Sequence, residues 1–159
     1  MSFMCIKGST LTNPYLLQFD GLSEPNPGAS SGGAVLFASC TTLVFEAGEF
    51  IPYATNNQAE YSGLILGLKH IIEICKDPID LRIEGDSQLI INQVAGKWKV
   101  KNAALKDLHT TVQSLIQNPI FKNVEIRHVY RDQNKHADKL TNDVMKTRTS
   151  FLHRGGGSD

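Results

Sequence analysis

The stretch YLLQFDGLSEPNPG, residues 15–28, runs from an apolar segment through an acidic residue into a loop rich in Pro, Asn and Gly. Tyr15, Leu17 and Phe19 occupy alternate positions, which predicts a strand, and Asp20 falls on the face opposite to theirs. A carboxylate on a central strand is costly to bury unless a bound cation or another partner compensates its charge. The alternative is that Asp20 only initiates the turn.

The chain as a whole has the composition of one ordinary globular domain. Its 159 residues are 41% hydrophobic and 20% charged, and the formal net charge is +0. A nucleic-acid partner therefore has to be inferred from local clusters of residues, not from bulk charge. Three scattered cysteines, Cys5, Cys40 and Cys75, exclude a disulfide framework. We find no apolar run that could cross a membrane and no export pattern, so the expected location is the cytosol, with the nucleus or an organelle as alternatives.

The remaining segments predict alternating strands and helices. In order they are strands at 32–39 and 42–50, a helix at 56–75, a strand at 79–85, helices at 87–94 and 103–117, a strand at 124–130 and a helix at 132–146. This order predicts an α/β domain, with a mixed sheet covered by helices. Gly63 and Gly67, four residues apart in the first helix, predict a close approach to another backbone. We expect residues 1–13 to form a frayed lead-in and residues 150–159 a flexible tail.

Four acidic residues start or end predicted elements on one rim of the sheet: Asp20, Glu60, Asp86 and Asp138. Each has an ordinary explanation. Glu60 in a first helical turn would favour the helix dipole, Asp86 could cap a helix, and Asp138 could lie on a solvated face. As a set they favour a site for hard divalent cations, which prefer oxygen ligands and relieve repulsion between carboxylates. Two such cations suit in-line displacement at phosphorus.

Four runs carry a resemblance to a known family: DGLSEPNPG, TNNQAEYSGLILGL, GDSQLIINQVAGKWKVKN and HVYRDQNKHADKL. Together, from about Tyr15 to Lys146, they resemble ribonuclease H of type HI. The resemblance implies a ribonuclease H-like fold over residues 14–149, with a five-stranded sheet in the order 3-2-1-4-5. It also implies a metal-dependent endonuclease that cuts the RNA strand of RNA–DNA hybrids and leaves 5′-phosphate and 3′-hydroxyl ends. Alternatives are a non-catalytic hybrid-binding module on the same fold and a nuclease that cuts DNA. Nothing in the sequence suggests more than a monomer.

The resemblance also implies roles for individual residues. Asp20, Glu60, Asp86 and Asp138 match the family's catalytic carboxylates, which hold two Mg²⁺ ions, with Mn²⁺ as a possible substitute. The expected hybrid contacts near the cut are Asn26, Asn56, Asn57 and Gln88, whose amides suit 2′-hydroxyls and base edges. Thr55 and Asn102 match a pocket for a DNA-strand phosphate. Trp98, between Lys97 and Lys99, matches a contact with the DNA backbone, and its alternative is a half-buried packing residue.

Two departures from the family pattern bear on function. Residues 93–102 are too short for the basic protrusion of many members, so we expect weak hybrid binding with a strong dependence on salt. The family's loop histidine has no clear counterpart, because His128 falls within a predicted strand and His136 is expected at the surface. Arg131 is a candidate substitute, as a cation near the leaving phosphate, and its alternative is an ordinary surface arginine.

Overall fold

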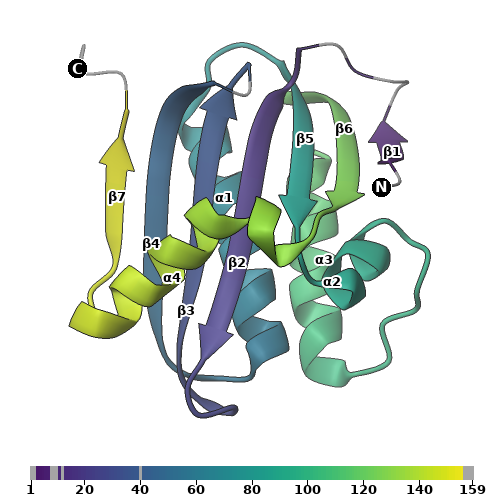
Figure 1. Cartoon of the computed structure of the whole chain (residues 1–159). Coiled ribbons are helices and arrows are strands. Elements are labelled where there is room, and N and C mark those ends of the chain that lie inside the picture. Colours follow the sequence, from purple (N-terminus) through teal and green to yellow (C-terminus); the bar gives the residue numbers. More distant parts are fainter. Residues whose placement is uncertain (1–2, 8–10, 12, 40, 156–159) are drawn as a thin grey trace.

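A single mixed sheet with helices on both faces forms the structure (Figure 1). The computed structural model describes residues 3–7, 11, 13–39 and 41–155, the first range by its backbone alone, so the side chains of Cys5 and Cys40 lie outside the described residues. Its strands are β1 (Phe3–Lys7), β2 (Tyr15–Ser23), β3 (Gly28–Ala38), β4 (Thr42–Ala54), β5 (Ile79–Gly85), β6 (Phe121–His128) and β7 (Phe151–Arg154). Its helices are α1 (Asn56–Ile74), α2 (Gln88–Val94), α3 (Ala103–Ile116), the short 3₁₀ helix η1 (Arg131–Gln133) and α4 (Lys135–Thr147).

The strand order is β1-β6-β5-β2-β3-β4-β7. The central five strands confirm the predicted order 3-2-1-4-5, with β2, β3 and β4 antiparallel and β5 parallel to both β2 and β6. The predicted count of five strands was too low, because β1 pairs with β6 and β7 pairs with β4 at the two edges. Both edge strands lie in the segments expected to be a lead-in and a tail. Backbone pairing needs no side-chain alternation, so short edge strands leave little pattern in a sequence.

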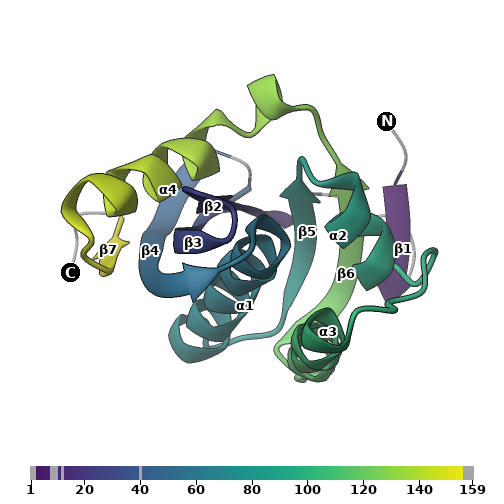
Figure 2. The same cartoon turned by 90° about the horizontal axis from the view of Figure 1, so that it is seen from below.

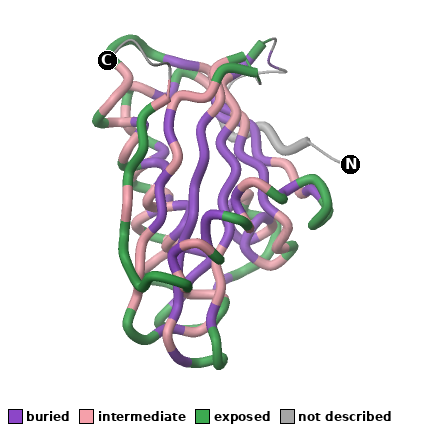
Figure 3. Tube along the Cα trace, turned by 60° about the vertical axis from the view of Figure 1, so that its left-hand side comes forward, coloured by how far each residue is buried: buried purple, intermediate pink, exposed green. Residues whose placement is uncertain are grey.

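The helices divide between the two faces of the sheet. Helices α1, α2 and α3 lie on one face and α4 crosses the other, as Figure 2 shows from the end of the sheet. The main core lies between the sheet and α1, where Leu17, Phe19, Leu64, Leu68 and Ile83 are fully or almost fully buried. Figure 3 shows this burial running along the central strands. No helix among the described residues combines the length and apolarity that a membrane span requires.

Three glycines let α1 contact the sheet backbone directly. A Cβ on Gly63 would lie 2.3 Å from the carbonyl oxygen of Asp20, and one on Gly32 would lie 2.8 Å from the backbone nitrogen of Gly63. A Cβ on Gly21 would lie 2.2 Å from the backbone nitrogen of Glu60. This contact confirms the close approach predicted for Gly63, and it places Glu60 against Gly21 on β2.

Helix α4 is tied to the other face by polar contacts. Ser31 on β3 donates a hydrogen bond from Oγ to the backbone oxygen of Thr141 over 2.9 Å. His136 bonds through Nε2 to the carboxylate of Glu46 on β4 and packs edge-on against Phe37. The His136 side chain is 35% exposed, in keeping with the expected surface position, but the sequence did not indicate its contact with Glu46. Helix α4 begins at Lys135, later than the predicted start at residue 132.

We expect the substitution Gly63→Ala to lower the free energy of unfolding by about 2–4 kcal/mol, because the added methyl group would overlap backbone atoms that cannot move independently. Urea denaturation monitored by circular dichroism would measure the change. Ser62→Ala, one residue away in the same helix, is the matched control and should change stability by less than about 0.5 kcal/mol. Equal stability of the Gly63→Ala variant and the wild type would contradict the close contact.

Candidate active site

Three carboxylates from separate elements meet at one point of the sheet. Asp20 lies on β2, Glu60 on α1 and Asp86 directly after β5, and one carboxylate oxygen of each lies within 4.8 Å of the others. Asp138, in the first turn of α4, lines the same cavity of about 370 Å³. All four acids predicted from the sequence therefore border one cavity, three of them in mutual contact range.

Backbone geometry holds Glu60 in place. The backbone N–H of Gly21 donates to Glu60 Oε1 over 2.7 Å, and the Glu60 residue is only 7% exposed. The expected position in the first turn of the helix was wrong, since the first turn of α1 contains no acidic residue. The capping box of Thr55 and Gln58 starts this helix instead. Glu60 therefore faces the sheet as a buried carboxylate and is not a solvated partner of the helix dipole.

Burial and nearby negative charge make Asp20 and Glu60 hard to ionise. The pKa of Asp20 is raised from its ordinary value of 3.8 to about 6, first by burial and then by the charges of Asp86 and Asp138, while its contact with Glu60 acts in the opposite direction. Burial, followed by the contact with Asp20, raises the pKa of Glu60 well above its usual range. Without a cation, this pair therefore retains a proton at mildly acidic pH.

The donor set fits hard divalent cations. It consists of carboxylate oxygens alone, with no thiolate or imidazole among them. Arg131 is the only basic side chain that lines the cavity within the described part of the chain. A cation held by Asp20, Glu60 and Asp86 would replace the retained proton and offset the repulsion between these groups.

A second, amide-rich cavity of about 660 Å³ adjoins the first, and Asn56 and Asn57 line both. Two helices begin at the lining of this cavity. Thr55 caps α1 through Oγ1, and Asn102 caps α3 by accepting a hydrogen bond from the backbone N–H of Leu105 over 3.1 Å. Asn26 also lines it and accepts a hydrogen bond from the backbone N–H of Asn56. Helix N-termini present N–H groups and partial positive charge, so this cavity suits an anion.

The other predicted contact residues lie outside both cavities. Gln88 is exposed at the start of α2. Trp98 is 47% exposed in the turn that follows α2, and Lys97 and Lys99 beside it are exposed. His128 lies on β6, as its phase predicted, with Nε2 3.2 Å from the backbone oxygen of Asp86.

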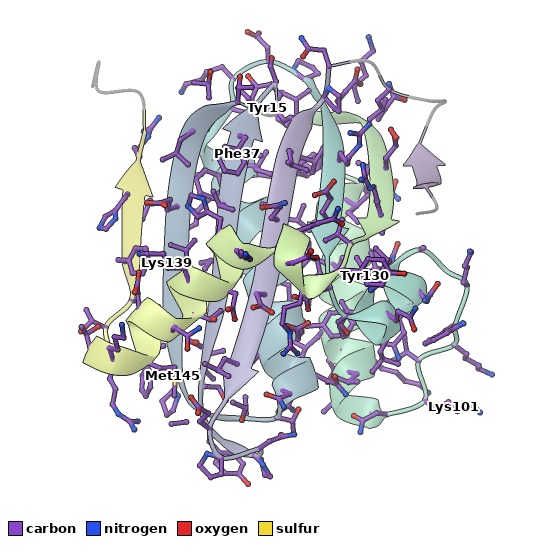
Figure 4. All side chains as sticks on the ribbon, viewed as in Figure 1. Tyr15, Phe37, Lys101, Tyr130, Lys139 and Met145 are labelled. Carbon is purple, nitrogen blue, oxygen red and sulfur yellow. The ribbon has the colours of Figure 1, made fainter. Side chains whose placement is uncertain are left out.

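Sequence reasoning missed Asn134, which is fully buried beside the cluster. Its Nδ2 donates to the carbonyl oxygen of Phe19 over 2.9 Å and to Asp86 Oδ2 over 3.2 Å. Asn134 falls inside the helix predicted from residue 132, where a polar residue is normally explained as solvated. The available signal was an asparagine near the start of this helix, in the run HVYRDQN. Figure 4 labels the exposed Tyr130 near this junction and Lys101 on the loop before α3.

The fold and the carboxylate cluster define the class: a ribonuclease H-type domain with acidic residues on β2, on α1 and directly after β5. A family model described as "Reverse transcriptase-like" matches residues 18–144, most of the chain. The chain therefore belongs to the reverse transcriptase-like family, with a domain of the ribonuclease H type. This finding confirms the family resemblance and the fold class expected from the sequence.

Curated relatives point the same way. Ribonuclease HI from Halobacterium salinarum is 39% identical over 127 residues, which cover 80% of this chain and 62% of that protein. The bifunctional protein Rv2228c from Mycobacterium tuberculosis is 37% identical over 131 residues, which cover 82% of this chain and 35% of that protein. The chain thus spans between 35% and 62% of the length of these two relatives.

Solved structures agree closely in fold. RNase H1 from Halobacterium salinarum NRC-1 superposes with a TM-score of 0.78 at 35% identity, covering 84% of this chain and 98% of that one. LC11-RNase H1, solved in complex with an RNA/DNA hybrid, superposes with a TM-score of 0.79 at 27% identity, covering 85% of this chain and 99% of that one.

We expect the stability of the metal-free protein to fall as pH rises from about 4 to about 6. In this range folded Asp20, with its pKa near 6, keeps a proton that the unfolded chain, with an ordinary pKa of 3.8, releases. Asp20→Asn removes the ionisable group, so it should raise the free energy of unfolding at pH 7 by up to about 3 kcal/mol. Chemical denaturation in EDTA at several pH values would measure this gain.

Asp77→Asn, which removes the same charge from an exposed position, is the matched control and should give no such gain. Mg²⁺ should then stabilise the wild type more than Asp20→Asn, because only the wild type has the full carboxylate set. An Asp20→Asn variant less stable than the wild type in EDTA would contradict the electrostatic account.

Proposed function

We propose that this domain is a metal-dependent endonuclease that hydrolyses the RNA strand of RNA–DNA hybrids and leaves 5′-phosphate and 3′-hydroxyl ends. The observation that carries the proposal is the convergence of Asp20, Glu60 and Asp86 within 4.8 Å, with Asp138 on the rim of the same cavity. The name of the Halobacterium relative and the hybrid bound to LC11-RNase H1 support the substrate class.

We assign the four carboxylates to two Mg²⁺ ions, with Mn²⁺ as a possible substitute. When bound, such a pair of ions supplies an activated water and a counter-charge for the leaving oxygen. The protein's part is to hold Asp20 and Glu60 in a buried, preformed arrangement, so that little rearrangement is needed on binding. Arg131, which lines the cavity, is the candidate cation near the leaving phosphate.

Amides rather than bulk positive charge would recognise the hybrid. Asn26, Asn56 and Asn57 line the cavity next to the carboxylates and suit 2′-hydroxyls, which distinguish RNA from DNA. Thr55 and Asn102 lie where α1 and α3 begin and suit a phosphate of the DNA strand. Gln88 and Trp98, exposed on and after α2, are proposed as outer contacts with the hybrid.

Two other functions are alternatives to this proposal, and the cleavage experiment described below distinguishes them from it. A non-catalytic hybrid-binding module would be expected to lack at least one of the four acids, and this chain has them all. A nuclease for double-stranded DNA would have less use for the asparagine amides beside the cleavage site. Monomeric action and a cytosolic location stay predictions from the sequence.

We expect the protein to cut an RNA–DNA duplex in Mg²⁺ or Mn²⁺, to cut it far faster than the matched DNA–DNA duplex, and to be inactive in EDTA. Asp20→Asn should reduce turnover by at least about 10³-fold without loss of structure, because it removes a ligand from the proposed metal centre. Gel analysis of end-labelled duplexes measures both effects, with Asp77→Asn as the charge-matched control. Near wild-type cleavage by Asp20→Asn would refute the assignment, and tight hybrid retention without cleavage would favour the binding module.

We expect Asn102→Asp to raise KM for the hybrid about tenfold with little change in kcat. Aspartate caps a helix as well as asparagine does, so the fold should be kept, while its negative charge would repel a bound phosphate. Asn102→Ser keeps a cap without the charge and should stay within about threefold of the wild type. If Asn102→Asp and Asn102→Ser give the same KM, no phosphate binds at this position.

A further inference from the structure

Asn134 joins the elements that carry three of the four acidic residues. Its Nδ2 group donates to the carbonyl oxygen of Phe19, the residue before Asp20 on β2, and to Oδ2 of Asp86, which follows β5. Its backbone oxygen accepts from the N–H of Asp138 over 3.1 Å in the first turn of α4. Asn134, which is fully buried, therefore connects β2, the segment after β5 and α4.

The amide lies where the parallel pairing of β2 and β5 stops. The register between these strands runs from Tyr15 with Leu81 to Gln18 with Glu84 and goes no further. Phe19 and Asp86 lie just beyond this last pair, beside the cavity that Asp20 and Asp86 line. The Asn134 amide bonds to both segments, so it links β2 to the end of β5 at the edge of the cavity.

Asn134 does this in place of ordinary helix capping. Thr55, Ser87 and Asn102, which precede α1, α2 and α3, have extended backbones, and each caps its helix with a side-chain oxygen. Asn134 precedes α4 with φ −123° and ψ 26° and makes no side-chain cap bond. Its Oδ1 is shielded from solvent and has no hydrogen-bond partner among the described residues. Burying an amide oxygen without a hydrogen-bond partner costs free energy. The hydrogen bonds of the amino group are therefore the contacts that hold this side chain in place.

We propose that Asn134 is a positioning residue for the metal centre, and that its amide sets the orientation of the Asp86 carboxylate relative to Asp20 and Glu60. Since one oxygen of Asp86 is held by Nδ2, rotation of the carboxylate is restricted and the direction of its second oxygen is set. Groups that orient metal ligands in this way commonly contribute about 10–100-fold to metal affinity or activity. The inference rests on the proposed metal-dependent function and extends it to a residue outside the ligand set.

The test is Mn²⁺ binding to the protein alone, measured by titration calorimetry well below the unfolding temperature, together with kcat and KM for the hybrid. Asn134→Ala removes the donor, and Asn134→Asp keeps the shape but replaces the donor with an acceptor. Both should weaken Mn²⁺ binding about 10–100-fold and lower kcat, with KM for the hybrid unchanged.

Ser31→Ala is the matched control. Ser31 is fully buried and ties α4 to β3 through the backbone of Thr141, and the structure records no bond from it to any of the four acids. It should lower the unfolding temperature and leave Mn²⁺ affinity unchanged. If the two Asn134 variants bind Mn²⁺ as the wild type does, Asn134 is only a structural residue and the inference is overturned.

A measurement on the wild type decides the question even if both Asn134 variants fail to fold. The side-chain amide signals of Asn134 in ¹H–¹⁵N NMR spectra should be protected from exchange and should shift on addition of Mg²⁺. Unchanged signals at saturating Mg²⁺ would overturn the inference. The nuclease proposal is tested separately by hybrid cleavage, so a wild type that binds Mn²⁺ but cuts nothing would refute that proposal alone.

Discussion

The contact of helix α1 with the backbones of β2 and β3 is the constraint on which the site depends. Only residues without a Cβ permit it, since a methyl group on Gly21, Gly32 or Gly63 would lie within 3 Å of backbone atoms across the interface. At this separation the N–H of Gly21 on β2 donates a hydrogen bond to the Glu60 carboxylate, which holds that carboxylate next to Asp20. The position of Glu60 relative to β2 is therefore set by main-chain packing.

The same packing buries negative charge that the protein itself compensates little. Asp20 and Glu60 are taken out of water beside Asp86 and Asp138, and the pKa values of both buried acids rise in consequence. The described protein compensates this charge little, because Arg131 is the one cation on the cavity lining and it is itself exposed. Compensation has to come from a ligand, which explains why an arrangement unfavourable for folding suits a cation site. The neighbouring helix N-termini add favourable potential for an anion while the chain as a whole remains neutral.

Much of the fold and of the candidate site could be predicted from the sequence, wherever a local rule and the tertiary structure agree. Alternation placed Asp20 and Asp86 on the polar side of neighbouring strands, and the spacing of Gly63 and Gly67 indicated close packing. The expectation that Asp20 ends its strand was wrong, because β2 continues to Ser23 by pairing with β3. The features that the sequence did not predict depend on contacts between distant segments. The burial of Glu60 and the contact of His136 with Glu46 follow from how α1 and α4 lie on the sheet, which no local pattern encodes. Asn134 was missed for a related reason, since it fell inside the helix predicted from residue 132 and the partners of its amide come from distant segments.

The short strand β7 has a consequence for the behaviour of the protein in concentrated solution. It covers part of β4, a strand of thirteen residues, by pairing Phe45 with Arg154 through to Gly48 with Phe151. Unpaired edges of long strands are templates for intermolecular β-sheet growth, and a four-residue outer strand offers far fewer free amides to a second molecule. Detachment of this segment would expose the backbone groups of β4 from Phe45 to Gly48 and would make this flank of the sheet prone to aggregation.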